Sequence, residues 1–159
     1  MEVDESYFGA RREGKCGRGA TGKTIVFGIY KRNGKVFTEI VFDVKKHTLQ
    51  AIIHGRVSIE TIIHSEFWRG YNSLVDVGYS KHRRINYSDN VFAIGDVHIN
   101  GIESFWSFAK RRLQKFNGVP TATFYLHLKE YEYRFNHRNE NLEQKLLKLL
   151  ERLLSLKSC

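Results

Sequence analysis

Three acidic residues, far apart in the chain, are the side chains best suited to chemistry. Asp4 lies in a strand-like segment, Glu66 stands just beyond another, and Glu103 lies inside a helical one. Carboxylates that converge in one crevice suit Mg²⁺, or two metal ions that bridge a scissile phosphate, because hard divalent cations prefer oxygen ligands. Taken singly, such residues are most often ordinary surface acids, so the prediction of a metal site depends on a fold that gathers all three.

Glu103 and Lys110 are seven residues apart in a helix predicted over 100–116, so they share one side of it. They lie at the border of its apolar stripe, where a carboxylate could reach into a cleft with a lysine beside it; a simple border ion pair is an equal alternative. Asn100 is predicted as the N-cap, with Glu103 in the capping-box position. The predicted stripe consists of Ile102, Phe105, Trp106, Ala109, Leu113 and Phe116.

Basic residues outnumber acidic ones, 26 to 17, and give the chain a formal net charge of +9. A charge of this size favours a polyanionic partner, either nucleic acid or an acidic membrane. A glycine-rich loop over 11–23 and the predicted helix over 100–116 supply the candidates for contacts with DNA phosphate. These candidates are Arg11, Arg12, Lys15, Arg18, Lys23, Arg111, Arg112 and Lys115.

Other chemistries have weaker support. Residues 17–24 satisfy the Walker A pattern, but a P-loop needs a buried strand before it and a helix after it. The preceding segment is polar and residues 25–30 are strand-like, so a basic loop that touches nucleic-acid phosphate is favoured. The two cysteines, Cys16 and Cys159, lie at opposite ends of the chain, and the histidines lack the H-x-x-x-H spacing, so zinc binding is not expected.

The elements that must position these residues follow from the periodicity of the apolar side chains. Strands are predicted over 3–9, 24–30, 35–44, 58–64 and 83–87, with Asn33-Gly34 as a hairpin turn. Helices are predicted over 47–57, 71–77, 100–116, 122–135 and 142–156. This order predicts a mixed sheet with helices, an α/β architecture. The leucine stripe of the last helix is expected to pack on the domain or on a second copy.

Six blocks of sequence, in order across residues 2–138, form a recognisable set: 4–9 (Asp-Glu-Ser-Tyr-Phe-Gly), 12–28, 68–71, 85–88, 97–111 and 135–138. Together they resemble the catalytic domain of bacterial insertion-sequence DDE transposases, the ISXO-type group. The resemblance implies a ribonuclease-H-like mixed sheet flanked by helices for residues 1–138, followed by a C-terminal amphipathic helix in 139–159. It also implies DNA cleavage and strand transfer at transposon ends that depend on Mg²⁺ or Mn²⁺.

The resemblance also implies roles for single residues. Asp4 matches the first catalytic aspartate, Glu103 the third acidic position and Lys110 the lysine seven residues on, while Asn100 is the alternative third position. Glu66 stands where the second catalytic aspartate is expected. With Asp4 and Glu103 it completes the implied metal ligands, but its extra methylene displaces the carboxylate, so the enzyme is expected to be impaired.

The implied partners are the DNA of the transposon ends and of the target, with a homodimer in the transposition complex. Relatives carry an N-terminal DNA-binding region ahead of the first strand, and we expect this chain to lack it. No apolar run can span a bilayer and the first residues form no signal peptide, so a cytoplasmic, nucleoid-associated protein is expected. The alternatives are an inactive DNA-binding remnant of a transposase, a stand-alone ribonuclease-H-like nuclease and, most distantly, a P-loop nucleotidase.

Overall fold

The structure, a computed structural model, describes residues 1–9, 22–66, 78–79, 82–85, 98–116 and 118–156, and within them the side chains of 66, 82–85 and 156 are not described. The described strands are β1 (Glu2–Phe8), β2 (Thr24–Tyr30), β3 (Val36–Val41), β4 (Ile63–Glu66) and β5 (His82–Ile85). The described helices are α1 (Lys46–His54), α2 (Asn100–Gln114), α3 (Thr121–Asn136) and α4 (Leu142–Leu156).

The five strands form one sheet in the order β3-β2-β1-β4-β5. The strand pairs β1–β2 and β2–β3 are antiparallel, whereas β1–β4 and β4–β5 are parallel. The tight connection between β2 and β3 is the predicted turn: Asn33 adopts a positive φ of 55°, and the amide of Gly34 donates to the carbonyl of Lys31 at 2.8 Å. This mixed sheet with its helices is the expected ribonuclease-H-like α/β fold, so the predicted fold class is confirmed.

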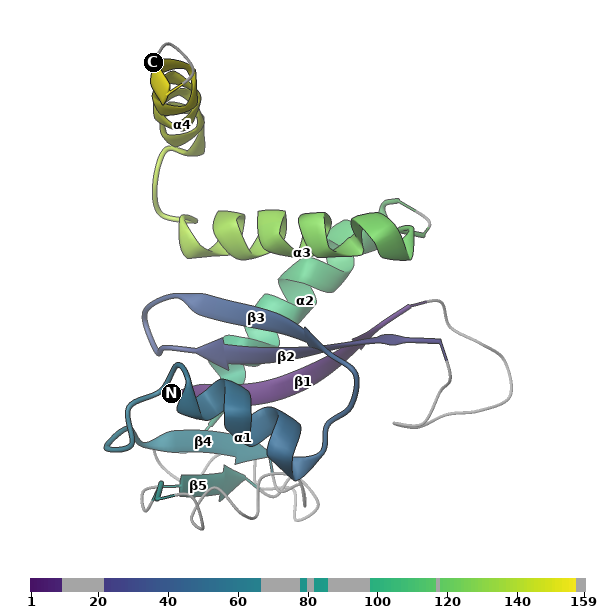
Figure 1. Cartoon of the computed structure of the whole chain (residues 1–159), viewed down its shortest axis with the longest axis vertical. Helices are drawn as coiled ribbons and strands as arrows, with labels where there is room; N and C mark the ends of the chain where they lie inside the picture. Colours follow the sequence, from purple (N-terminus) through teal and green to yellow (C-terminus); the bar gives the residue numbers. More distant parts are fainter. Residues whose placement is uncertain (10–21, 67–77, 80–81, 86–97, 117, 157–159) are drawn as a thin grey trace.

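Each face of the sheet has its own apolar core, because successive strand residues point to opposite faces. Val3 of β1 belongs to the core beneath α1, which also contains Leu49 and Ile53 of that helix. Phe8 of β1 belongs to the core formed with α2 and α3. Figure 1 shows α1 on one side of the sheet and α2 on the other, with α3 next to the β3 edge. The face toward α2 is the one that matters for the site below.

Side chains of α3 seal the outer edge of β3. Asn136 accepts a hydrogen bond from the amide of Val36 at 2.7 Å and donates one to its carbonyl at 2.8 Å. The amide of Thr38 donates to Glu132 at 2.8 Å, and Lys129 donates to the carbonyl of Thr38 at 2.7 Å. An exposed edge strand offers such groups to other chains, so this edge ladder (Lys129, Glu132 and Asn136) blocks further pairing there.

Several details of the sequence predictions are wrong. The third strand ends at Val41 and not at residue 44, and α1 ends at His54 and not at residue 57. The fourth strand begins at Ile63 and not at residue 58, because the amide of Thr61 closes a turn onto the carbonyl of Ser58 at 2.9 Å and leaves Ile59 49% exposed. The fifth strand covers His82–Ile85, so it begins one residue earlier than predicted. Phe116 lies beyond the end of α2 and is 51% exposed, so it is not part of the buried stripe.

The C-terminal helix α4 has the predicted bounds, but its leucines are not covered. Leu149, Leu150 and Leu153 are about half exposed, so this stripe does not pack on the domain. Packing on a second copy, the other expectation, stays a prediction. The helix predicted over 71–77 lies outside the described residues. Among the helices that the structure describes, none has the length and apolar character needed to cross a membrane.

Candidate active site

Asp4 lies at the middle of β1, the central strand, on the face that packs against α2. Its side chain is buried, with 8% exposure. The Oδ2 atom accepts a hydrogen bond of 2.9 Å from the indole Nε1 of Trp106 on α2. The predicted catalytic aspartate is therefore bonded directly to the helix that carries Asn100, Glu103 and Lys110.

A glycine on the neighbouring strand makes room for this contact. Gly28 of β2 is paired with Asp4 across the sheet. A Cβ atom at Gly28 would lie 2.6 Å from Cζ2 of Trp106 and 2.8 Å from Cδ1 of Ile102, too close for any side chain. The absence of a side chain at position 28 thus lets α2 approach the sheet closely enough for Trp106 to reach Asp4.

A second buried acid on β1, Glu2, fixes the beginning of α2. Its Oε2 accepts a hydrogen bond from the amide of Ile102 at 2.9 Å, and its Oε1 accepts one from Nε of Arg32 at 3.0 Å. This arrangement overturns the predicted cap. Asn100 is the first helical residue, Ile99 is the N-cap position, and no side chain of the cap residue bonds to the helix. Glu2 satisfies an amide of the first turn from another strand, so neither Asn100 nor Glu103 is needed for a capping box.

Glu103, Trp106 and Lys110 occupy one row along α2, because residues three and four apart share a helix face. Two positions of this α2 row interact with Asp4. Trp106 donates its hydrogen bond, and partial burial lowers the pKa of Lys110 from its ordinary value, an effect that the Asp4 carboxylate opposes and the positive charge of Lys23 reinforces. Although Lys110 is exposed overall, its Nζ lies 5.7 Å from the ring centroid of Phe8. Glu103 is partly exposed, one turn before Trp106.

Glu66 is the last residue of β4, which runs parallel to β1. Glu2 pairs with His64, and continuing this parallel register by two residues along both strands would bring the backbone of Glu66 level with Asp4. The side chain of Glu66 lies outside the description, so the predicted clustering of Asp4, Glu66 and Glu103 stays a prediction. Among the side chains that are described, no three from His, Cys, Asp and Glu are grouped to hold a metal ion. The donor set proposed from the sequence is all carboxylate, which fits Mg²⁺ or Mn²⁺.

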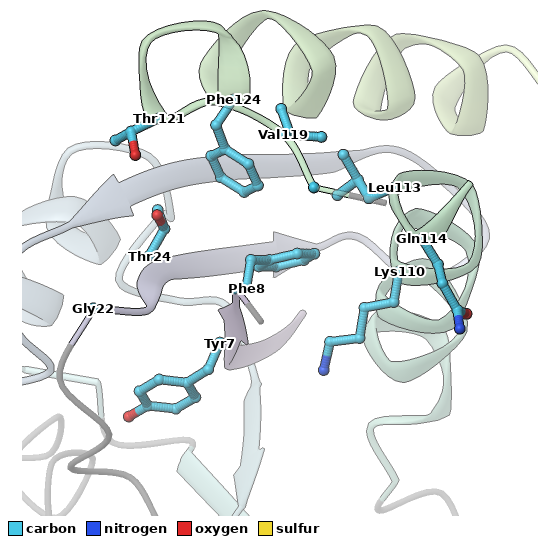
Figure 2. Close-up of a pocket in the computed structure, with 12 residues that line it drawn as sticks. Tyr7, Phe8, Gly22, Thr24, Lys110, Leu113, Gln114, Val119, Thr121 and Phe124 are labelled. Carbon is cyan, nitrogen blue, oxygen red and sulfur yellow. The ribbon is translucent and has the colours of Figure 1, made fainter. Parts of the chain in front are cut away.

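A pocket of about 670 Å³ lies beside this site, at the end of β1. Figure 2 shows Lys110 extending from α2 toward that end of the strand, below Phe8 and Phe124. The apolar wall of the pocket is formed by Phe8, Leu113, Val119 and Phe124. The polar lining of the pocket consists of Tyr7, Thr24, Lys110, Gln114 and Thr121. A lysine beside aromatic rings and hydroxyl groups is suited to nucleic acid, whose phosphates are anionic and whose bases are planar.

The predicted DNA-contacting residues fall into two groups. Arg11, Arg12, Lys15 and Arg18 lie outside the described residues. Lys23 directly precedes β2 and acts electrostatically on Lys110, so it borders the site. On and just after the last turn of α2, three exposed basic side chains extend the positive charge away from Asp4. They are Arg111, Arg112 and Lys115.

Sequence reasoning missed two contributors to the site and one of the two roles of a third. Glu2 was not singled out, although an acid two residues before Asp4 must share its strand face. Gly28 carried no local signal, because the need for space arises only when α2 packs on the sheet. Trp106 was expected only as core, and its indole N–H, which must find a partner when buried, was the available clue.

Comparisons with known proteins show sequence similarity to transposases. The profile of the family described as ISXO2-like transposase domain matches residues 1–136. The chain is also similar to a protein of Haemophilus influenzae named "Uncharacterized transposase-like protein", with 44% identity over 116 residues. That match covers 73% of this chain and 93% of the other protein. The residues matched by the family profile include the whole α2 row, from Glu103 to Lys110.

Proposed function

The chain belongs to the ISXO2-like transposase family, and from this premise we propose that it cleaves DNA and transfers strands at the ends of an insertion sequence with the help of divalent metal ions. The observation that carries the proposal is the contact between Asp4 and the α2 row. Asp4 meets Trp106 directly and interacts with the charge of Lys110, and Glu103 lies one turn away on the same row. A metal site of this kind needs acidic side chains from the central strand and from the helix packed on it, and Asp4 and Glu103 are candidates for these two positions.

We propose Asp4, Glu66 and Glu103 as the metal ligands, with Mg²⁺ or Mn²⁺ as the ion. The level register of Glu66 with Asp4 supports its inclusion. Glu103 is preferred to Asn100 as the third position because it is adjacent to Trp106 on the row, whereas Asn100 begins the helix and is exposed. The chemistry that bound metal supplies in such sites is activation of a water or a 3′-hydroxyl and stabilisation of the leaving oxygen.

Lys110 is proposed to hold a phosphate of the DNA strand beside Asp4. Its ammonium group is partly buried, lies 5.7 Å from the ring centroid of Phe8 and interacts electrostatically with the Asp4 carboxylate. A charge in such a setting acts on a phosphate more strongly than one in open water. The neighbouring pocket, Lys23 and the basic residues at the end of α2 would then continue the contact with the DNA backbone.

The remaining parts of the proposal concern assembly and place. Residues 1–138 would form the catalytic domain and 139–159 an appended amphipathic helix, whose uncovered leucines suit a homodimer in the transposition complex. DNA, as transposon ends and target, is the proposed partner, and the proposed location is the cytoplasm, on the nucleoid.

The decisive experiment compares the parent chain with Glu66→Asp and Asp4→Asn in a cleavage assay, with and without Mg²⁺, on DNA that carries the sequences flanking the gene. A metal site needs its carboxylates placed within tenths of an ångström, so we expect weak cleavage by the parent and stronger cleavage by Glu66→Asp. Asp4→Asn in the Glu66→Asp background should abolish the gain. Equal activity of parent and Glu66→Asp would show that glutamate is tolerated, and activity that survives Asp4→Asn would refute the site.

Glu66 itself favours a second candidate, an inactive DNA-binding remnant of a transposase. In that case neither the parent nor Glu66→Asp cleaves DNA, while both bind it with strong salt dependence. Cleavage without any strand-transfer product would instead indicate a stand-alone nuclease of the same fold.

A further inference from the structure

We infer that Trp106 is a positioning residue for the metal site: its indole N–H fixes the orientation of the Asp4 carboxylate toward a divalent cation. This inference rests on the proposed function, because it gives a purpose to Asp4 as a ligand. It assigns to a core tryptophan a role that packing alone does not require.

The contact has the character of a specific buried hydrogen bond. Trp106 is 5% exposed and Asp4 8%, and Nε1 lies 2.9 Å from Oδ2. An indole nitrogen can only donate, so the direction of this bond is fixed. Burial alone would be satisfied by a side chain without a polar atom, so the donor adds something beyond burial.

The donor is also held rigidly. The indole ring lies over Gly28, where even a Cβ atom would come within 2.6 Å. Phe8 meets the ring edge-on at 6.0 Å between centroids, and Phe105 lies at 5.1 Å on the same helix. Because Gly28, Phe8 and Phe105 surround the indole, it cannot turn away from Asp4 unless α2 moves relative to the sheet. The fixed indole can therefore hold the Asp4 carboxylate at one rotation about the Cβ–Cγ bond of Asp4.

Such outer contacts matter for metal sites because they orient the ligand before the ion arrives. The same bond ties β1 to α2 one turn from Glu103, so it also restrains the separation of two proposed ligands. Loss of an outer-shell partner typically weakens metal binding by 10-fold to 100-fold. We expect the loss of the indole donor to have an effect at the lower end of this range.

The first test measures the affinity of the chain for Mn²⁺ by titration calorimetry, without DNA. Trp106→Phe keeps an aromatic ring but removes the donor, and we expect it to weaken Mn²⁺ binding by about tenfold. Phe135→Leu is the matched control, since it truncates a buried ring of the same core, one that packs on Phe105 rather than on the indole, and it should leave the affinity within about twofold. An unchanged affinity in Trp106→Phe would overturn the inference while leaving the proposed function intact.

A second measurement does not depend on how Trp106→Phe folds. The chain has two tryptophans, Trp68 and Trp106, so its ¹H–¹⁵N spectrum contains two indole signals, which Trp68→Phe assigns. Titration with Mg²⁺ should shift the Trp106 signal in a saturable way, and Asp4→Asn should abolish that shift. A parent chain that binds Mn²⁺ but shows no Trp106 shift contradicts the inference alone. A parent chain that binds neither ion contradicts the proposed metal site as well.

Discussion

Helices α2 and α4 each contain 15 residues and carry one apolar stripe, but only the stripe of α2 is buried. Ile102 and Phe105 of α2 are fully buried, whereas Leu149 and Leu153 of α4 are 50% and 51% exposed. In Figure 1 α2 lies against the sheet and α4 stands away from it. The difference shows that apolar periodicity specifies a helix and its apolar face. Whether another surface covers this face is decided by the rest of the fold.

The two helices also begin in different ways. At the start of α4, Oδ1 of Asn141 accepts a hydrogen bond from the amide of Gln144 at 3.1 Å, which is a cap supplied by the neighbouring sequence. At the start of α2 the acceptor is Glu2, 100 residues away along the chain. The α4 helix is thus defined locally, and α2 is defined by the sheet against which it packs. Three predictions test this contrast, taken in order of expected effect.

The largest effect is expected from truncating the buried stripe. Phe105→Ala should lower the free energy of unfolding by about 3–5 kcal/mol, because it removes a fully buried ring and leaves a cavity. Leu153→Ala in α4 should change it by less than about 0.5 kcal/mol. Urea denaturation followed by circular dichroism measures both. A comparable loss in the two variants, growing with protein concentration, would show that a second chain covers α4 in solution.

Removing the two caps should give the next largest contrast. Glu2→Ala leaves Arg32 and the amide of Ile102 without their buried acceptor and should destabilise the whole domain by about 3 kcal/mol. Asn141→Ala should cost about 1 kcal/mol, felt only by α4. Hydrogen exchange resolved by residue separates the outcomes: faster exchange throughout the sheet for the first variant, and in α4 alone for the second. Faster exchange in α4 alone for Glu2→Ala would contradict the capping role.

The smallest effect concerns DNA binding. Arg111 on α2 lies near the proposed site, and Lys148 lies on α4, and both side chains are exposed. Arg111→Gln should reduce the slope of log affinity against log salt concentration by about 1, since one phosphate contact is lost. Lys148→Gln should leave the slope unchanged. Fluorescence anisotropy with a labelled duplex at several salt concentrations measures both, and equal slopes for the two variants would place the DNA elsewhere.

The sequence was most informative where one short segment decides the structure. Asn33-Gly34 predicts its hairpin because few residues other than Asn and Gly accept a positive φ. The leucine spacing predicts both bounds of α4. Asp4 and Lys110 were chosen for their chemistry and because they match positions of the transposase family. In the structure the two side chains interact electrostatically.

The sequence was least informative where distant segments meet. The cap that Glu2 provides, the space that Gly28 leaves and the bond from Trp106 to Asp4 exist only after β1, β2 and α2 pack together. The late start of β4 has a similar cause. Residues 58–62 have the apolar pattern of a strand, but a turn within them competes with pairing, and pattern alone cannot weigh the two.

The edge ladder of α3 has a consequence for folding during synthesis on the ribosome. The hydrogen bonds that complete β3 come from a residue 100 positions later, since Val36 is bonded by Asn136. At a synthesis rate of about 5–20 residues per second, the outer edge of the sheet therefore waits for about 5–20 s before its partner emerges. During that interval neighbouring nascent chains on one messenger RNA present open strand edges to one another, and such edges can pair between chains.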